Sequence, residues 1–374
     1  MLLKTIKRQV KKHLGPYINP DVVIFLRKYA DMAEINFNAA LGRHFLPHPR
    51  RIIMIETSGI CNLSCRFCAY PKKERGKVVM PMTLFQEVVN QAADMGFSAI
   101  NITPQLGDGF MDKTLLEKMQ YLDNHPKIKR YDFFTNFVVP SEQKIKELFK
   151  LRKLNILRVS VYGHDEKSFC DLTQATKKEY HRLVRNLKCL YKLYDQNRSF
   201  QLDLQGRTVS SFSSFSGKSS RSELQEIMLN FEKTHQVVCE GIFQYHSMVG
   251  KVTNEDVKGL GLRINDGSNI YKKGFCSRLM TSSGVLADGR VDACLCRDVI
   301  DGSLVVGNVK KEPLSYILSL NNPLYADIIQ EQIEGKLRPV CKNCDYYHSI
   351  YKPEVRWGSF KTYHLNQMKA LLSK

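Results

Sequence analysis

The chain has 374 residues, and its hydrophobic fraction of 43% can supply the core of one large domain and a smaller second one. Its eleven cysteines follow no apolar secretory segment, because the N-terminus is charged from Lys4 onward, so we expect reduced thiols in a cytoplasmic protein. No run of eighteen or more apolar residues occurs, which argues against a membrane-spanning helix. The formal charge of +19 predicts an acidic partner such as nucleic acid, an anionic lipid surface or a phosphorylated substrate.

The first fifty residues are predicted to be a basic helical extension. Within residues 1–14, apolar side chains recur at helical spacing while lysines and arginines fill the other faces. The apolar positions are Leu3, Ile6, Val10 and Leu14. This pattern can form a helix that lies on an anionic bilayer, but it is more often a solvated helix docked on the body of the protein.

From Arg51 onward, short β-rich runs alternate with longer amphipathic runs, which predicts a parallel sheet covered by helices. The expected strands are residues 52–56, 99–103, 131–135, 156–161, 200–204 and 237–245. The expected helices are residues 83–95, 112–124, 142–154, 178–194 and 222–234. The serine-rich residues 210–220 are predicted to be a mobile loop, and the glycine-containing residues 251–270 a linker between residues 51–250 and a second domain at 271–350. This pattern does not distinguish a partial barrel from an open doubly wound sheet.

Three cysteines stand close together just after the first expected strand, at Cys61, Cys65 and Cys68. Thiols spaced by three and then two residues can hold one cubane iron–sulfur cluster and leave its fourth iron without a protein ligand. The alternative is a zinc knuckle or three unrelated buried thiols. A structural zinc site needs four ligands, and the nearest histidines in sequence are His48 and His125.

A second group of cysteines follows the expected linker and ends in a C-x-x-C pair. Its members are Cys276, Cys294, Cys341 and Cys344, with Cys296 as an alternative to Cys294. Four such ligands suit either a zinc ribbon or an iron–sulfur cluster. The remaining candidates, Cys170, Cys189 and Cys239, are expected to be small buried hydrophobic residues.

The first cysteine motif, with the aromatic Phe67 before its third cysteine, resembles that of the radical S-adenosylmethionine (radical SAM) superfamily. The resemblance implies an α/β fold, a partial (β/α)6 TIM-like barrel over residues 51–250, with the cysteine loop after the first strand. It also implies that Cys61, Cys65 and Cys68 hold a SAM-binding [4Fe–4S] cluster. Such enzymes take an electron from an external donor such as flavodoxin or ferredoxin, cleave SAM to a 5′-deoxyadenosyl radical and abstract a hydrogen atom from a substrate carbon.

Two further turns resemble the SAM-binding motifs of this family. Gly107 and Asp108 correspond to part of its Gly-Gly-Glu turn, with one glycine lost and a shorter acid, and imply a contact with the amino group of SAM. Asn136 belongs to a segment like the family's Thr-Asn-Gly turn, in which Phe137 replaces the glycine.

Two positions later in the core domain complete the expected SAM site. Ser160 lies in a segment similar to the one that contributes a serine near the SAM ribose or carboxylate. Arg207, just past the fifth expected strand, is expected to pair with the SAM carboxylate, or else to be a surface arginine.

The C-terminal cysteine pattern, C-x12-G-x4-C followed by C-x-x-C, resembles the SPASM/twitch extension of radical SAM enzymes. No cysteine follows Cys344, so the resemblance is to the shorter twitch form, with one auxiliary [4Fe–4S] cluster held by Cys276, Cys294, Cys341 and Cys344. The tail at 351–374 carries no recognisable motif.

The resemblance implies an oxidoreductase, and we expect dehydrogenation of a sugar, an aminocyclitol or a lipid-linked glycan, with the auxiliary cluster receiving an electron. The alternatives are a peptide or protein side-chain maturase and a sugar epimerase. A zinc-binding nucleic-acid module would need an aromatic and basic stripe that the chain lacks, so no nucleic-acid partner is expected. The expected location is the cytoplasm, with peripheral contact to the inner face of the membrane as an option that the basic N-terminus suggests.

Overall fold

The computed structural model describes residues 20–73, 76–207, 221–235, 237, 239–241, 244–295, 298, 302–353 and 361–373. The predicted basic helix at 1–14, the serine-rich segment at 210–220 and Cys296 lie outside these ranges. Within them, no helix is both long and apolar enough to cross a bilayer.

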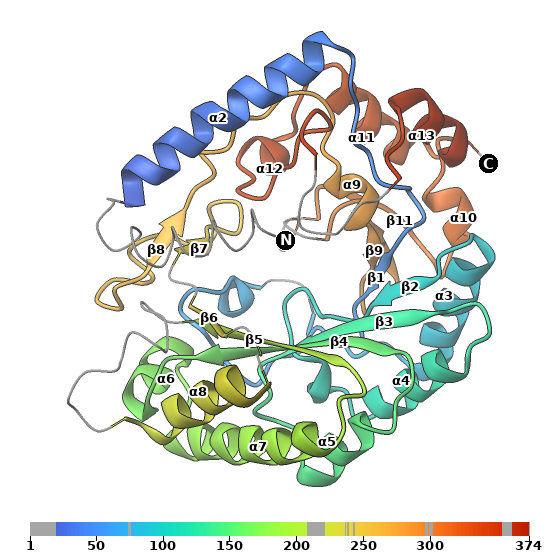
Figure 1. Cartoon of the computed structure of the whole chain (residues 1–374). Coiled ribbons are helices and arrows are strands. Elements are labelled where there is room, and N and C mark those ends of the chain that lie inside the picture. Colours follow the sequence, from blue (N-terminus) through green and yellow to red (C-terminus); the bar gives the residue numbers. More distant parts are fainter. Residues whose placement is uncertain are drawn as a thin grey trace.

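A nine-stranded sheet with the order β11-β10-β9-β1-β2-β3-β4-β5-β6 forms the centre of the molecule (Figure 1). Its first six strands in the chain pair in parallel, each with the next along the sequence. They are β1 (Ile53–Ile55), β2 (Ala99–Asn101), β3 (Arg130–Thr135), β4 (Leu154–Tyr162), β5 (Gln201–Arg207) and β6 (Cys239–Gly241). This is the partial (β/α)6 barrel predicted from the sequence.

The helices between these strands cover the outer face of the sheet (Figure 1). They are α3 (Met82–Asp94), α4 (Leu115–Asn124), α5 (Glu142–Leu148), α6 (Glu166–Thr173), α7 (Lys177–Gln196) and α8 (Glu223–His235). Helix α7 begins at a capping box in which Thr176 and Glu179 bind each other's backbone N–H groups. The side of α7 that faces the sheet carries Leu183, Leu187 and Leu190, all fully buried.

Helix α5 is shorter than the expected 142–154. A residue at the end of α4 binds the backbone that follows α5. The carboxylate of Asp123, at the end of α4, accepts hydrogen bonds from the backbone N–H groups of Arg152 at 2.9 Å and Lys153 at 2.7 Å. These two N–H groups are therefore unavailable to continue a helix. Strand β4 begins directly afterwards, at Leu154.

The single strand expected over residues 237–245 is two strands in the structure. β6 ends at Gly241 and stays in the main sheet, whereas β7 (Gln244–His246) pairs in parallel with β8 (Arg263–Asn265) in a separate two-stranded sheet. β8 falls within the expected linker at 251–270, so this segment contains regular structure.

The C-terminal part continues the main sheet on the other side of β1. β9 (Gly284–Val285) pairs in parallel with β1, and β10 (Arg290–Asp292) and β11 (Val305–Asn308) add two antiparallel pairings. The helices that follow or flank these strands are α9 (Arg278–Thr281), α10 (Leu314–Ile317), α11 (Pro323–Ile333), α12 (Pro339–Lys342) and α13 (Leu365–Leu372). The long helix α2 (Pro20–Ala40) runs along the outside of this part of the molecule (Figure 1).

Candidate cofactor sites

Cys61, Cys65 and Cys68 lie in the loop that joins β1 to a short 3₁₀ turn at Tyr70–Lys72. Backbone N–H groups point at two of the sulfurs: that of Leu63 lies 3.5 Å from Cys61 Sγ, and that of Tyr70 lies 3.4 Å from Cys68 Sγ. Such donors stabilise negative charge on sulfur.

Burial raises the pKa of Cys61 to about 12, with smaller contributions from Asp108 and Cys68. Burial also raises the pKa of Cys65, and the neighbouring Cys68 and Cys61 raise it further. The three thiols are therefore close enough to influence each other electrostatically. Buried thiols of this kind become thiolates when a metal supplies the compensating positive charge.

Across the described ranges, no three His, Cys, Asp or Glu side chains converge on one point that could hold a single metal ion. The ligands of a cubane cluster bind separate iron atoms and need no common point. A loop that offers three thiols as its ligands, two of them with N–H donors at the sulfur, fits a [4Fe–4S] cluster with one iron left open to SAM.

The turn after β2 packs directly against the cysteine loop. The backbone N–H of Asp108 donates to the carbonyl oxygen of Ile60 at 2.7 Å. A Cβ at Gly107 would lie 2.5 Å from the carbonyl oxygen of Ser58, so only glycine allows this approach. Gly107 allows the close backbone approach that we predicted, and the backbone that it approaches is that of the cysteine loop.

The Asp108 side chain is 2% exposed and joins the turns after β2 and β3. Its carboxylate accepts hydrogen bonds from the N–H of Phe110 at 3.0 Å, the hydroxyl of Thr135 at 2.9 Å and the N–H of Asn136 at 2.7 Å. Burial raises its pKa, and these donors oppose the shift. The carboxylate is already engaged within the protein, and its expected contact with the SAM ammonium stays a prediction.

Asn136 reaches from the turn after β3 to the cysteine loop. Its side-chain amide donates to Asn62 Oδ1 at 2.8 Å and lies 3.9 Å from Cys61 Sγ. Phe137, which stands where the family has glycine, keeps the left-handed backbone with φ of 60° and is fully buried. An aromatic residue in this left-handed conformation costs more strain than glycine would.

Aromatic rings and one arginine lie beside the cysteine loop. The ring of Phe67 packs against Tyr162 and Tyr245, with centroids 5.3 Å and 4.5 Å away. The guanidinium of Arg207, at the end of β5, lies 5.9 Å from the Tyr245 ring centroid. Burial raises the pKa of the Cys68 thiol, and the positive charge of Arg207 opposes that shift, which places Arg207 near the cysteines.

Arg207 Nε is buried and has no hydrogen-bond partner among the described residues. A terminal nitrogen of the same guanidinium lies 3.5 Å from Gln205 Oε1, which is a long contact. A buried donor without a partner is rare in proteins and suits an anionic ligand.

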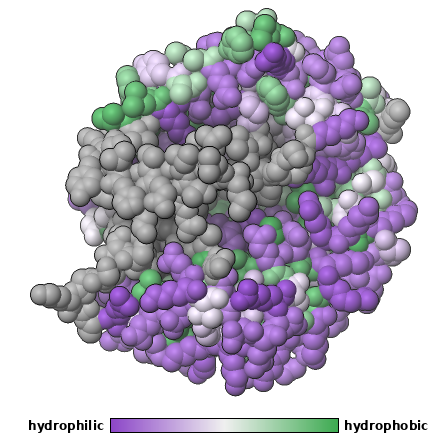
Figure 2. Space-filling view, in the orientation of Figure 1, coloured by the Kyte–Doolittle hydropathy of each residue, from purple (hydrophilic) through white to green (hydrophobic). Residues whose placement is uncertain are grey.

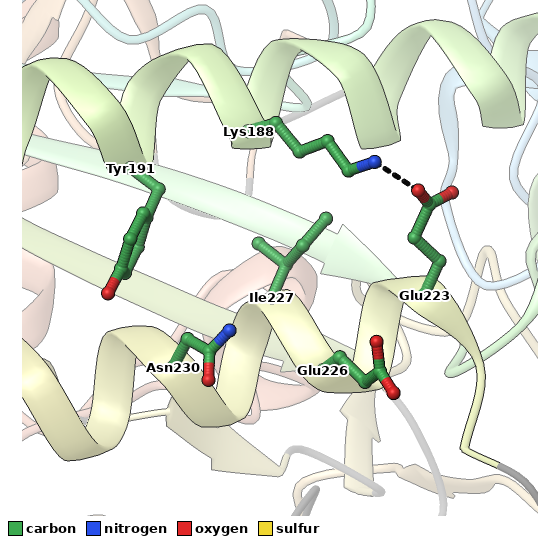
Figure 3. Close-up of a pocket in the computed structure, with 6 residues that line it drawn as sticks. All are labelled: Lys188, Tyr191, Glu223, Glu226, Ile227 and Asn230. Carbon is green, nitrogen blue, oxygen red and sulfur yellow. Dashed lines mark hydrogen bonds and ion pairs between the residues drawn. The ribbon is translucent and has the colours of Figure 1, made fainter.

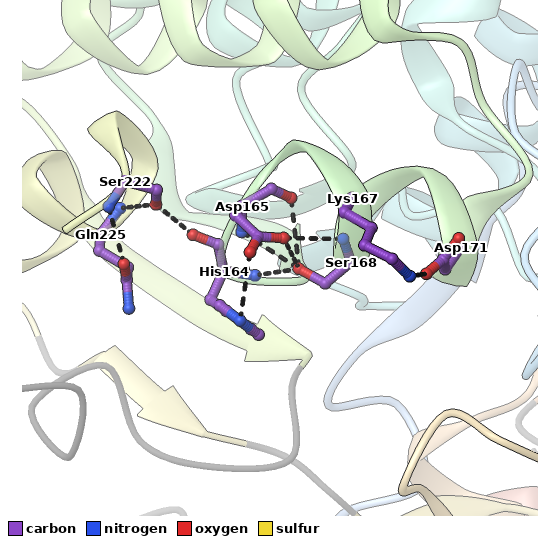
Figure 4. A network of polar contacts seen from close by, with 7 residues as sticks. All are labelled: His164, Asp165, Lys167, Ser168, Asp171, Ser222 and Gln225. Carbon is purple, nitrogen blue, oxygen red and sulfur yellow. Dashed lines mark hydrogen bonds and ion pairs between the residues drawn. The ribbon is translucent and has the colours of Figure 1, made fainter. Parts of the chain in front are cut away.

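Ser160 lies on β4 and is buried. Beyond the end of β4, Asp165 caps helix α6 by accepting the N–H of Ser168 at 2.7 Å (Figure 4). The carbonyl oxygen of the preceding His164 accepts a hydrogen bond from the Ser222 hydroxyl, just before α8. This network fixes the loop at the end of β4 to the start of α8.

The four C-terminal cysteines of the predicted auxiliary site line one cavity, although up to 68 positions separate them in the sequence (276 to 344). The lining combines the four thiols with apolar and aromatic side chains and two polar ones: Cys276, Cys294, Cys341, Cys344, Leu279, Leu304, Val340, Tyr346, Tyr347, Arg278 and Gln332. Backbone N–H groups again point at sulfur: that of Tyr346 lies 3.2 Å from Cys344 Sγ, and that of His348 lies 3.4 Å from Cys276 Sγ. A cavity with four thiols and apolar walls fits a cluster ligated entirely by the protein.

Gln332, on α11, joins two of these cysteines and was not identified from the sequence. Its Oε1 accepts the backbone N–H of Cys276 at 2.9 Å, and its Nε2 donates to Cys341 Sγ at 3.3 Å. It is 2% exposed, on the same side of the helix as the buried Ile328 and Ile329. The sequence signal that could have identified Gln332 is a polar residue among the apolar positions of an amphipathic helix.

A separate pocket lies between α7 and α8, on the outer side of the sheet (Figure 3). Lys188 and Glu223 form an ion pair across it, and Tyr191, Glu226, Ile227 and Asn230 complete its lining. None of the predicted site residues lines this pocket.

The family comparisons cover both cysteine sites. The model of the radical SAM superfamily matches residues 55–200, and the model of the SPASM iron–sulfur cluster-binding domain matches residues 276–345. The chain belongs to the radical SAM superfamily. As a radical SAM enzyme with a SPASM domain, it uses SAM, a SAM-binding [4Fe–4S] cluster and an auxiliary iron–sulfur site, as predicted.

Several solved structures are similar to this chain. BtrN in complex with AdoMet and 2-DOIA is 17% identical with a TM-score of 0.49, and covers 81% of this chain and 95% of its own. The enzyme anSMEcpe with bound AdoMet is 14% identical with a TM-score of 0.50, and the match covers 86% of this chain and 95% of anSMEcpe. SuiB of Streptococcus suis bound to S-adenosylmethionine is 13% identical with a TM-score of 0.45, and the match covers 85% of this chain and 73% of SuiB. No curated protein matches this chain.

Proposed function

We propose that this radical SAM enzyme dehydrogenates a small-molecule or glycan substrate, oxidising a secondary alcohol to a ketone. When bound, the first cluster and SAM supply the 5′-deoxyadenosyl radical that takes a hydrogen atom from the substrate carbon. An external donor provides the electron for SAM cleavage. The substrate would then lose its hydroxyl proton to a base or to water, and a cluster held by Cys276, Cys294, Cys341 and Cys344 would accept its remaining electron.

The observation that carries this proposal is the single cavity lined by Cys276, Cys294, Cys341 and Cys344. Four thiolates are enough to ligate every iron of one cubane cluster. A cluster closed in this way has no free position for substrate, and its available chemistry is electron transfer. An electron acceptor inside the enzyme favours a net oxidation over a redox-neutral reaction.

At the first site, we propose that Cys61, Cys65 and Cys68 are the cluster ligands. The unpartnered Nε of Arg207 would bind the SAM carboxylate, and the Asn136 amide lies close enough to Cys61 Sγ to contact either the cluster sulfur or SAM. Asp108 holds the two turns that position Asn136 against the cysteine loop.

The proposed substrate class is a sugar, an aminocyclitol or a lipid-linked glycan. The net charge of +19 supports a substrate that carries phosphate or a lipid-phosphate carrier, because a positive protein field concentrates anions near its surface.

The test uses protein purified and reconstituted without oxygen, with iron content, 5′-deoxyadenosine and oxidised product measured together. We expect about eight irons per chain for two cubane clusters. The Cys341→Ala, Cys344→Ala double variant should still cleave SAM but form no ketone from any member of a panel of sugars and aminocyclitols that the wild type oxidises. The matched control is Cys170→Ala, Cys189→Ala, since neither thiol belongs to the two sites.

The triple variant with alanine at Cys61, Cys65 and Cys68 should keep about four irons and lose SAM cleavage. If the folded Cys341, Cys344 variant formed oxidised product at the wild-type rate, the acceptor role would be wrong, and an epimerisation would explain the chain better.

A further inference from the structure

Helix α2 turns an apolar face away from the protein. Six of the nine large hydrophobic residues that are exposed in the described ranges belong to or directly follow this helix. They are Val22, Phe25, Leu26, Tyr29, Phe37 and Leu41, with exposed fractions between 48% and 61%. Figure 2 shows them as an apolar edge where Figure 1 draws α2. Val22, Phe25 and Tyr29 follow one another at spacings of three and four residues and Phe37 and Leu41 at four, which puts them on the outward side near the start and near the end of the helix.

The opposite side of α2 contacts the body of the protein through polar side chains and the buried Ile35. Lys28 Nζ donates to the carbonyl oxygen of Ser268 at 3.0 Å, and Asp31 forms an ion pair with Lys352 at 2.5 Å. The side chain of Asn38 donates to the carbonyl oxygen of Tyr351 at 3.0 Å.

Asn36, also on α2, accepts hydrogen bonds from Tyr271 at 3.1 Å and from Lys273 at 2.8 Å. A helix that merely packs on a protein buries its apolar side and exposes its polar side. α2 buries Ile35 but leaves its larger apolar residues on the outward side, a distribution typical of a surface that binds a partner.

We propose that the outward face of α2 docks on a lipid bilayer that contains anionic lipid. The face belongs to a single helix of 21 residues on the outside of the molecule, about 31 Å long at 1.5 Å per residue, which suits a flat surface better than a groove. The rings of Phe25 and Tyr29 pack against each other in a tilted arrangement with centroids 4.6 Å apart, and aromatic residues favour the membrane interface.

Charge favours an anionic bilayer over a second copy of this chain. The chain carries a net charge of +19, so two copies would repel each other, whereas an anionic surface attracts each one. Basic residues flank the face: Arg27 is exposed on α2, and the Arg43 guanidinium lies 6.0 Å from the Phe37 ring centroid. The sequence just before α2 is also basic, with five lysines and arginines within residues 4–12. The inference concerns where the enzyme works and does not depend on the proposed reaction.

The test is co-sedimentation of the full-length holoenzyme with vesicles of phosphatidylcholine alone or mixed with phosphatidylglycerol. The variant carries Phe25→Gln, Leu26→Gln and Phe37→Gln, because glutamine preserves the helix and removes the apolar surface. We expect its affinity for the mixed vesicles to fall about 100-fold, or about 2.8 kcal/mol. The matched control replaces three exposed apolar residues elsewhere, with Val78→Gln, Tyr316→Gln and Leu324→Gln, and should bind like the wild type.

Iron content and SAM cleavage should be unchanged in both variants, which verifies that they fold. Added salt should weaken the wild-type binding, since it screens the attraction to phosphatidylglycerol. The proposal is wrong if the wild type does not sediment with the mixed vesicles, if it binds pure phosphatidylcholine equally well, or if the α2 variant binds like the wild type. Sedimentation velocity without lipid provides a further refutation: a dimer that the α2 substitutions dissociate would make this face a contact between copies.

Discussion

Gln332 allows a quantitative test of the auxiliary site. Its Nε2–H donates to Cys341 Sγ at 3.3 Å, in a place that is 2% exposed. Gln332→Leu removes this donor but keeps much of the volume. Hydrogen bonds to charged acceptors contribute about 1.5–3 kcal/mol, and the bond is stronger when the reduced cluster places more charge on sulfur. If about 1 kcal/mol of it distinguishes the two redox states, the midpoint potential of the auxiliary cluster should fall by about 40 mV.

The measurement is a redox titration of the auxiliary cluster followed by electron paramagnetic resonance, on variants with full iron content. Gln332→Glu keeps an acceptor for the N–H of Cys276, loses the donor to Cys341 and adds a negative charge, so its potential should fall at least as far. Gln330→Leu is the control, because Gln330 lies on the same helix, is exposed and contacts Glu334 at 2.8 Å. A Gln332→Leu enzyme with the potential of the Gln330→Leu enzyme would refute the reasoning.

Four further substitutions test the SAM site and the turns beside it. Arg207→Gln removes the unpartnered buried donor and should weaken SAM binding about tenfold in calorimetry; unchanged affinity would assign Arg207 a purely structural role. Asp108→Ala should weaken SAM binding by about tenfold or more at unchanged iron content. Because its carboxylate joins two turns, Asp108→Asn should also lower the melting temperature, at a cost of about 1–3 kcal/mol. Phe137→Gly relieves about 1 kcal/mol of left-handed strain but loses about 3–5 kcal/mol of aromatic burial, so it should melt at a lower temperature than the wild type.

The sequence was informative where the signal is local. The spacing of Cys61, Cys65 and Cys68 lies within one loop, and the alternation of β-rich and amphipathic runs predicted five of the six barrel strands within a few residues. The four C-terminal cysteines were grouped through their resemblance to a known pattern, and the fold brings all of them to one cavity.

Features that depend on distant partners were beyond the sequence. Helix α5 ends where it does because Asp123, on another helix, binds the N–H groups that follow it. The run at 237–245 reads as one strand, but its second half pairs with β8 about twenty positions later. The outward apolar face of α2 also required the structure, because an apolar stripe in a sequence is normally expected to face the core.

The pairing of β1 with both β2 and β9 has a consequence for protein engineering. One hydrogen-bonded sheet runs from the barrel into the SPASM part, with Met54 beside Gly284 and Ile55 beside Val285. A shortened chain that stops before residue 284 would leave β1, and with it the base of the Cys61 loop, as an open edge prone to aggregation. A chimaera that replaces the SPASM part must therefore supply a strand with glycine opposite Met54, because any Cβ there would overlap the Met54 carbonyl. The two cofactor regions should accordingly be exchanged, expressed and evolved as one unit.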